Sequence, residues 1–182
     1  MAAKMIDTTP NAAEPSPWIV RHAGLARAKG RVLDVACGGG RNGRFFLQRS
    51  HPTVFLDIDG AKVRDLKGTN GVEIMETDLE TKTPNAWPFD SASFAVVVAT
   101  NYLWRPLMPA LIDSIAPGGV FLYETFAVGN EAFGRPKNPE FLLKAGELLE
   151  MVRGKLRVVA FGQETRRVPN PSVVQHIAAV RD

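Results

Sequence analysis

The sequence of 182 residues has very little of several features that mark whole classes of protein. Its single cysteine, Cys37, excludes an intrachain disulfide, so a disulfide-stabilised secreted fold is ruled out and a reducing, cytoplasmic compartment is expected. No apolar run is long enough to cross a bilayer, so we expect no membrane association. Only three histidines are present, scattered along the chain, and no spacing of ligand residues predicts a metal site.

The excess of basic over acidic residues is also small. The formal net charge is +3, which is low for a nucleic-acid-binding protein and ordinary for a small enzyme. The apolar fraction of 45% and the charged fraction of 23% are typical of a soluble globular protein. The length favours one domain. Residues 1–15 are small, polar and interrupted by proline, so we expect a flexible tail there and a single domain over residues 16–182.

The chain does contain a strand, a glycine run and a helix start within twelve residues, from Val32 to Gly43. The residues at 32–35 are mostly apolar, as in a strand covered on both faces of a parallel sheet. Gly38, Gly39 and Gly40 have no Cβ, so a ligand can lie directly against their backbone. A strand, a glycine turn and a helix in this order form the nucleotide-binding corner of a doubly wound α/β sheet.

An acidic residue within the strand decides between two nucleotide chemistries. Gly38, Gly40 and Gly43 formally satisfy the dinucleotide pattern G-x-G-x-x-G, which is weak evidence alone. Asp34 precedes the first of these glycines by four residues, where its carboxylate would repel a pyrophosphate. It suits a cationic ligand instead. Asp57 ends the second predicted strand, where an acid binds ribose hydroxyls in either case.

The stretch 32–43 resembles motif I of the class I S-adenosylmethionine-dependent methyltransferases, an acid-containing strand followed by G-x-G-x-G. In this sequence Ala36 or Cys37 replaces the first glycine, depending on the alignment. In that family an acid after the third strand accepts from the adenine amino group beside an apolar residue. The resemblance implies that S-adenosylmethionine is bound by Asp34, Ala36, Cys37, Gly38, Gly40, Asn42, Asp57, Ile58, Asp78, Leu79 and Asn101.

The order of the predicted elements is similar to the same family along most of the chain. A helix is expected to begin with Ser16 as its N-cap and Pro17 at its first position, and Gly30 to end the element. Further helices are expected at 41–49, 61–66, 107–115 and around 147–152, and strands at 32–35, 53–57, 71–76, 94–99, 120–126, 156–164 and 172–179. The resemblance therefore implies a Rossmann-like, doubly wound α/β fold with a seven-stranded sheet that ends in an antiparallel strand. Dinucleotide-binding domains usually lack that last pair.

The methyl acceptor is expected at the carboxyl ends of the fourth and fifth strands, where ligands bind in open α/β sheets. Catalytic candidates there are Asn101, Tyr102 and Arg105. The first helix is either an amphipathic helix on the sheet or a lid over the site, and His51 and His176 are interpreted as structural. Candidate acceptor-binding residues are Trp18, His22, Trp104, Glu124, Phe126 and Arg135.

The layout is most similar to small single-domain bacterial methyltransferases of the tellurite-resistance type. That resemblance implies methyl transfer from S-adenosylmethionine to a small-molecule acceptor by in-line displacement, with S-adenosylhomocysteine as product, in a monomer or weak homodimer. Alternatives are an RNA methyltransferase, which arginines at 21, 27, 31, 41, 44 and 49 would serve, and a non-catalytic S-adenosylmethionine-binding regulatory protein. A nicotinamide-dependent dehydrogenase is disfavoured by Asp34 and by the terminal strand pair.

Overall fold

A computed structural model describes residues 14–81, 87–167 and 170–182. The predicted flexible tail, residues 1–15, lies outside the described residues except for its last two. Within the described part, no helix combines the length and the apolar character needed to span a bilayer.

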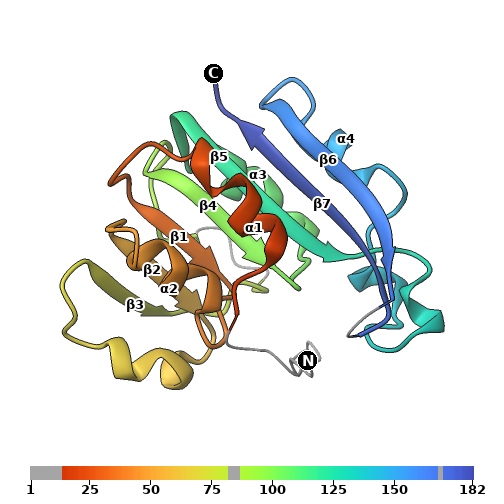
Figure 1. Cartoon of the computed structure of the whole chain (residues 1–182), viewed down its shortest axis with the longest axis horizontal. Coiled ribbons are helices and arrows are strands. Elements are labelled where there is room, and N and C mark those ends of the chain that lie inside the picture. The colour runs from red at the N-terminus through yellow and green to blue at the C-terminus, as the bar shows by residue number, and fades with distance from the viewer. Residues whose placement is uncertain (1–13, 82–86, 168–169) are drawn as a thin grey trace.

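The described chain is built on one seven-stranded mixed sheet in the order β3-β2-β1-β4-β5-β7-β6 (Figure 1). β1 to β5 are parallel, and β7 is antiparallel to both β5 and β6. The predicted fold class is confirmed. The strands are β1 (Val32–Val35), β2 (Thr53–Asp57), β3 (Val72–Glu76), β4 (Phe94–Thr100), β5 (Ile115–Phe126), β6 (Arg157–Arg166) and β7 (Ser172–Val180).

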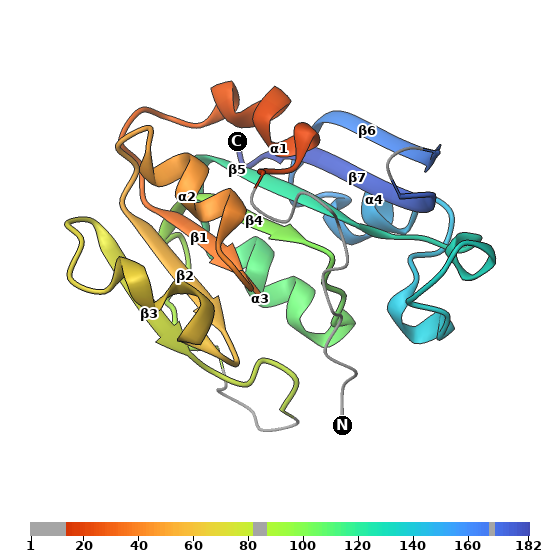
Figure 2. The same ribbon diagram turned by 60° about the horizontal axis from the view of Figure 1, so that its bottom comes forward.

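Helices cover both faces of the sheet, with α1 and α2 on one side and α3 on the other (Figure 2). The first face carries α1 (Pro17–His22), η1 (Ala23–Leu25), α2 (Arg41–Leu47) and η2 (Gly60–Leu66). The second carries η3 (Arg105–Leu107), α3 (Met108–Asp113) and α4 (Glu147–Val152). The connection after β5 contains η4 (Asn130–Ala132) and η5 (Pro139–Phe141).

Two apolar layers result from the alternation of side chains along the strands. On the α1 face, Val96, Val98 and Leu122 pack against Ile19 and Phe46. On the opposite face, strand residues pack against the apolar sides of α3 and α4. The central strands are long apolar runs because both of their faces are covered, which is why they could be predicted from sequence.

Helix boundaries differ most from expectation. Ser16 caps α1 and Pro17 follows it, as predicted, but the helix ends at His22 and continues only as the 3-10 turn η1. The expected helix at 107–115 is divided into η3 and α3. β5 begins earlier than expected, because the Pro-Gly-Gly stretch at 117–119 is part of the strand, where Gly118 donates its N–H to the carbonyl of Arg181.

Candidate active site

The glycine loop between β1 and α2 requires left-handed backbone at alternate positions. Ala36 has φ +49°, Gly38 φ +54° and Gly40 φ +71°. The residue in the place of the first motif glycine is therefore Ala36 and not Cys37, and its small side chain tolerates a conformation that favours glycine. The alternative alignment through Cys37 is not supported by the structure.

The glycines of this loop differ in what surrounds them. A Cβ at Gly38 or Gly39 would meet no atom within 4 Å. A Cβ at Gly43 would lie 2.4 Å from a ring carbon of Phe55, and one at Gly40 would lie 2.8 Å from the same ring. Gly40 and Gly43 thus let the start of α2 pack closely on β2, whereas Gly38 and Gly39 leave open space above the loop for a ligand.

Asp34 lies under this loop and is only 2% exposed. One of its oxygens, Oδ2, accepts the backbone N–H of Gly43 at 2.7 Å. Burial raises the pKa of Asp34 to about 7, although the bond from Gly43 and the charge of Arg41 lower it. A buried carboxyl with this pKa becomes ionised when a cation binds nearby, as expected for a site that takes a sulfonium and an ammonium group.

Asp57, at the end of β2, faces the same loop. Its Oδ2 accepts the N–H of Gly38 at 2.8 Å, and its Oδ1 accepts the N–H of Asp59 at 3.0 Å. The carboxylate is thus held at the carboxyl edge of the sheet, the place for ribose hydroxyls. Next to it, Ile58 exposes 62% of its surface, which is unusual for a large aliphatic side chain and fits an apolar contact with a ligand.

The loop after β3 supplies the remaining predicted adenine contacts. Asp78 is exposed and accepts the N–H of Glu80, while Leu79 is 7% exposed and packs on the core. Tyr102 faces this region. Its hydroxyl is buried without a hydrogen-bond partner in the described part of the chain, and burial, with the charges of Glu80 and Asp78, raises the pKa of Tyr102. An orphaned buried hydroxyl beside an acidic loop fits an adenosine-bearing ligand.

Asn101 follows β4 with φ +57°, a conformation uncommon outside glycine. Its backbone N–H bonds the carbonyl of Glu124 at 2.9 Å, which fixes the end of β4 to β5. Strained backbone at the carboxyl end of a central strand is typical of functional sites. Asn101 thus lies at the carboxyl end of β4, and its predicted contact with the cofactor stays a prediction.

The side chains of Asn42, a predicted cofactor-binding residue, and Arg105, a catalytic candidate, are engaged in contacts with other parts of the chain. Asn42 is 2% exposed; its Oδ1 accepts from the N–H of Ser16 and its Nδ2 donates to Thr100. Arg105 pairs with Glu147 at 2.6 Å and donates to two carbonyls of the segment 140–142. Asn42 thus anchors the N-terminal segment, and Arg105 anchors the loop before α4.

The first helix packs on the sheet as an amphipathic element, which disfavours a lid. Trp18 is 9% exposed, stacks on His176 with ring centroids 3.7 Å apart, and donates its indole N–H to the carbonyl of Ile177. A ring nitrogen of His22 lies 2.9 Å from the carbonyl of Trp18. These contacts favour a structural role for Trp18 and His22.

The other acceptor-side candidates surround the carboxyl ends of β4 and β5. Trp104 and Phe126 are half-buried there, and Arg135 is exposed in the loop that follows β5. The same loop exposes two apolar side chains, Val128 at 51% and Phe133 at 48%. Several large apolar side chains are therefore present near the carboxyl ends of these two strands.

Glu124 is at this edge too, but it is not free to bind an acceptor. It is 2% exposed and paired with Arg166, a residue that the sequence did not single out. Arg166 lies in the last hairpin, outside every recognised motif, so no pattern in the sequence could have identified it. Ser16 was predicted as a helix cap, and its bond to Glu124 joins segments 108 residues apart.

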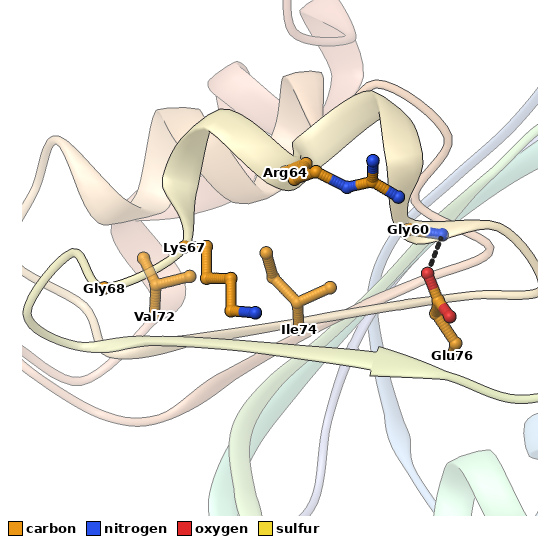
Figure 3. A pocket seen from close by; sticks show the side chains of 7 residues that line it. All are labelled: Gly60, Arg64, Lys67, Gly68, Val72, Ile74 and Glu76. Atoms are coloured by element: carbon orange, nitrogen blue, oxygen red, sulfur yellow. Dashed lines mark hydrogen bonds between the residues drawn. The ribbon is translucent and has the colours of Figure 1, made fainter.

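A hollow of about 510 Å³ lies away from the glycine loop, between η2 and the edge strand β3. Figure 3 shows η2 above β3, with the side chains of Arg64 and Lys67 between them and Glu76 bonded to the backbone of Gly60. The described residues that line it do not include the predicted cofactor ligands.

Comparison with known proteins agrees with this geometry. Residues 32–119 match the family described as "Methyltransferase domain". Solved structures share the fold: TehB from Haemophilus influenzae (18% identity, TM-score 0.69, 90% of this chain and 61% of that one) and an S-adenosylmethionine-dependent methyltransferase from Mesorhizobium loti (14%, 0.67, 89% and 96%). Another is the 1,6-didemethyltoxoflavin-N1-methyltransferase of Burkholderia thailandensis, with its substrate and S-adenosylhomocysteine bound (17%, 0.68, 94% and 79%). No curated protein sequence matches.

The matched segment contains the glycine loop, Asp34, Asp57 and the strand order around them. The chain therefore has the fold of the class I methyltransferases, whose cofactor is S-adenosylmethionine, and its residues 32–119 match a methyltransferase domain. The open space at Gly38, the orphaned hydroxyl of Tyr102 and the exposed Ile58 fit that cofactor. This chain spans 61% of the TehB chain, so likeness to TehB indicates a shared fold and not a shared acceptor.

Proposed function

We propose that this enzyme transfers the methyl group to a small, largely apolar acceptor at the carboxyl ends of β4 and β5. When bound, S-adenosylmethionine supplies a methyl group already activated by a positively charged sulfur. The protein then has to align the acceptor with that methyl group and exclude water. We assign the cofactor side to Asp34, Asp57, Asp78 and the loop at 36–40, and the acceptor side to Asn101 and the loop that follows β5.

The observation that carries this proposal is the number of large apolar side chains near the carboxyl ends of β4 and β5. Phe126 and Trp104 are half-buried, and Val128 and Phe133 are exposed although they are large and apolar. Small-molecule sites are mostly apolar with few polar groups, whereas RNA-binding faces are basic. In the solved neighbour from Burkholderia thailandensis, the bound substrate is a small molecule, which supports the same class of acceptor here.

Arg31, Arg44 and Arg49, three of the six arginines that would serve an RNA substrate, are engaged in contacts with other side chains. Arg31 pairs with Glu73, and Arg44 pairs with Asp65. Arg49 lies 3.7 Å over the ring of Phe45. Such residues form part of the packed surface rather than a basic face available to phosphates. We therefore favour the small-molecule acceptor, in a single cytoplasmic domain over residues 16–182.

The test is incubation of the purified chain with methyl-labelled S-adenosylmethionine and either a small-molecule cell extract or total RNA. We expect label in the small-molecule fraction and formation of S-adenosylhomocysteine, both lost in Asp57→Ala. An Asp65→Ala variant, which removes an exposed carboxylate on η2, is the matched control and should retain transfer. Label in RNA would overturn the acceptor class. No transfer from a chain that binds S-adenosylhomocysteine would favour the non-catalytic alternative.

A further inference from the structure

A row of polar side chains crosses the sheet at the carboxyl end of its α1 face. Thr100 on β4, Glu124 on β5 and His176 on β7 are register partners and share one face. Below them the same face is apolar, with Val98 and Leu122 among its buried residues. A buried charged row in an apolar layer is costly unless its members are paired.

Glu124 is the centre of this row. Its carboxylate accepts hydrogen bonds from Arg166 Nη2 at 2.6 Å and from Arg166 Nη1 at 3.2 Å. The hydroxyl of Ser16 donates to its Oε1 at 3.1 Å. Burial opposes ionisation, but His176, Arg166 and Ser16 together lower the pKa of Glu124 to about 2. The carboxylate of Glu124 thus accepts three hydrogen bonds, two of them from the guanidinium of Arg166.

His176 does not act as a base in this arrangement. Its Nδ1 lies 3.7 Å from Glu124, and a Cβ at Gly162 on β6 would lie 2.3 Å from its Nε2. The ring therefore spans from β5 to β6, and Nε2 is directed away from β4, where the reaction is expected. Trp18 covers the ring face. These contacts leave a structural role.

Ser16 uses every polar group it has at this point. Its hydroxyl donates to Glu124 and accepts the N–H of Trp18 at 3.2 Å, and its backbone N–H donates to Asn42 at 3.0 Å. Arg41, the residue before Asn42, donates its Nη1 to the carbonyl of Glu14 at 3.0 Å. The segment 14–16 is therefore fastened between the end of β5 and the first residues of α2.

α2 begins directly after the glycine loop, and Asn42 also donates to Thr100 at the end of β4 at 2.9 Å. Asn42 therefore joins both the segment 14–16 and the end of β4 to the first turn of α2. We propose that Glu124 is a positioning residue for the cofactor site: through Ser16 it fastens the segment 14–16 against α2 and so fixes the glycine loop. It contacts neither cofactor nor acceptor.

A purely stabilising role is a weaker explanation of the network. Buried ion pairs contribute little net stability compared with apolar packing of the same volume, and they are best understood where they impose one arrangement. Here the arrangement joins three segments that are distant in sequence, residues 14–16, 41–42 and 124, at the edge where the cofactor binds. The inference does not depend on the identity of the acceptor.

The test compares Ser16→Ala with Ser16→Thr. Alanine removes the bond to Glu124, whereas threonine retains a hydroxyl that can donate to Glu124 and cap α1. Hydrogen exchange of residues 38–44 in the unliganded chain and calorimetric affinity for S-adenosylhomocysteine are the two readouts. We expect Ser16→Ala to exchange faster at 38–44 and to bind about tenfold more weakly, and Ser16→Thr to resemble wild type. Glu124→Gln, which removes the charge, should behave like Ser16→Ala.

An unrelated loss of a side-chain contact is controlled with Arg157→Ala, which breaks an exposed ion pair with Asp182. That variant should leave exchange at 38–44 and the affinity unchanged. If Ser16→Ala exchanges faster only in α1, while residues 38–44 and the affinity remain as in wild type, the proposal is overturned. The exchange readout needs no ligand, so it decides the proposal even if the acceptor class proves to be wrong.

Discussion

The carboxylate of Asp34 and the backbone N–H of Gly43 are 2.7 Å apart, so the acid of β1 is bonded to the first turn of α2 beneath the glycine loop. Burial raises the pKa of Asp34 to about 7, even though this bond favours its ionised form. Asp34 is therefore close to half-ionised at neutral pH in the unliganded chain. It becomes a full counter-charge only when a cation is nearby.

Proton release on cofactor binding follows from this pKa. The ammonium and sulfonium of S-adenosylmethionine stabilise ionised Asp34, so binding should release close to one proton at pH 6, about half at pH 7 and almost none at pH 9. Affinity should rise between pH 6 and pH 8. Calorimetry in buffers of different ionisation enthalpy measures the released protons directly. Asp34→Asn, which still accepts from Gly43, should release none and bind at least tenfold more weakly.

The raised pKa of Asp34 should also make the stability of the unliganded chain depend on pH. Stability should fall as pH rises, whereas the affinity for the cofactor rises. Because the pKa of Asp34 is higher folded than unfolded, the folded chain binds more protons between pH 4 and pH 7, and the contribution of this group to the unfolding free energy falls as pH rises through that window. The total is on the order of 4 kcal/mol. Denaturant unfolding of wild type and Asp34→Asn at pH 5 and pH 8 measures it. Asp34→Asn should be stabilised relative to wild type more at pH 8, and an equal difference at both pH values would contradict this account.

Substitution of Gly43, which packs on Phe55, and of Gly38, which faces open space, should have different effects. Gly43→Ala places a methyl group 2.4 Å from Phe55, so it should reduce the unfolding free energy by about 1–3 kcal/mol. Gly38→Ala meets no protein atom, and its φ of +54° costs only about 1–2 kcal/mol. Because its methyl group enters the ligand space, it should lose more than tenfold in affinity for S-adenosylhomocysteine. Thermal unfolding and calorimetry separate the two. Unchanged affinity in a folded Gly38→Ala variant would show that the cofactor does not cover this glycine.

Arg105 should stabilise the loop on the acceptor side without affecting the affinity for the cofactor. Arg105→Ala removes the pair with Glu147 and the bonds to the segment 140–142, so proteolysis within 139–147 should become faster while affinity for S-adenosylhomocysteine stays within twofold. Arg105→Lys should restore little, because one ammonium cannot reproduce a two-pronged guanidinium contact. Arg153→Ala, which breaks an exposed pair with Glu150, is the matched control and should have little effect. A large loss of cofactor affinity in Arg105→Ala would contradict this role and indicate that Arg105 acts at the reaction centre.

Strands and the glycine loop could be predicted because their signals are local. β4 is a run of apolar residues covered on both faces, and the loop at 36–40 contains three consecutive glycines directly after a predicted strand. The cofactor-side acids Asp34 and Asp57 belong to the same short segments, so their places at the carboxyl edge followed from the strands themselves.

Side chains whose partners are distant in sequence could not be assigned in this way. Asn42 bonds Ser16 across 26 positions, and Arg105 pairs with Glu147 across 42. Both had been expected to bind ligands, because polarity near a predicted site is all that the sequence shows. Arg166 was missed for the same reason: its partner, Glu124, is its neighbour only after β7 has paired with both β5 and β6.

Calorimetric titration with S-adenosylhomocysteine, beside NAD and NADP, tests the central claim most directly. The account predicts micromolar binding of S-adenosylhomocysteine, no binding of either dinucleotide, and a loss of about 100-fold in Asp57→Ala, which removes two accepted backbone hydrogen bonds as well as the ribose contact. Binding of a dinucleotide instead, or S-adenosylhomocysteine affinity that survives Asp57→Ala unchanged, would contradict it.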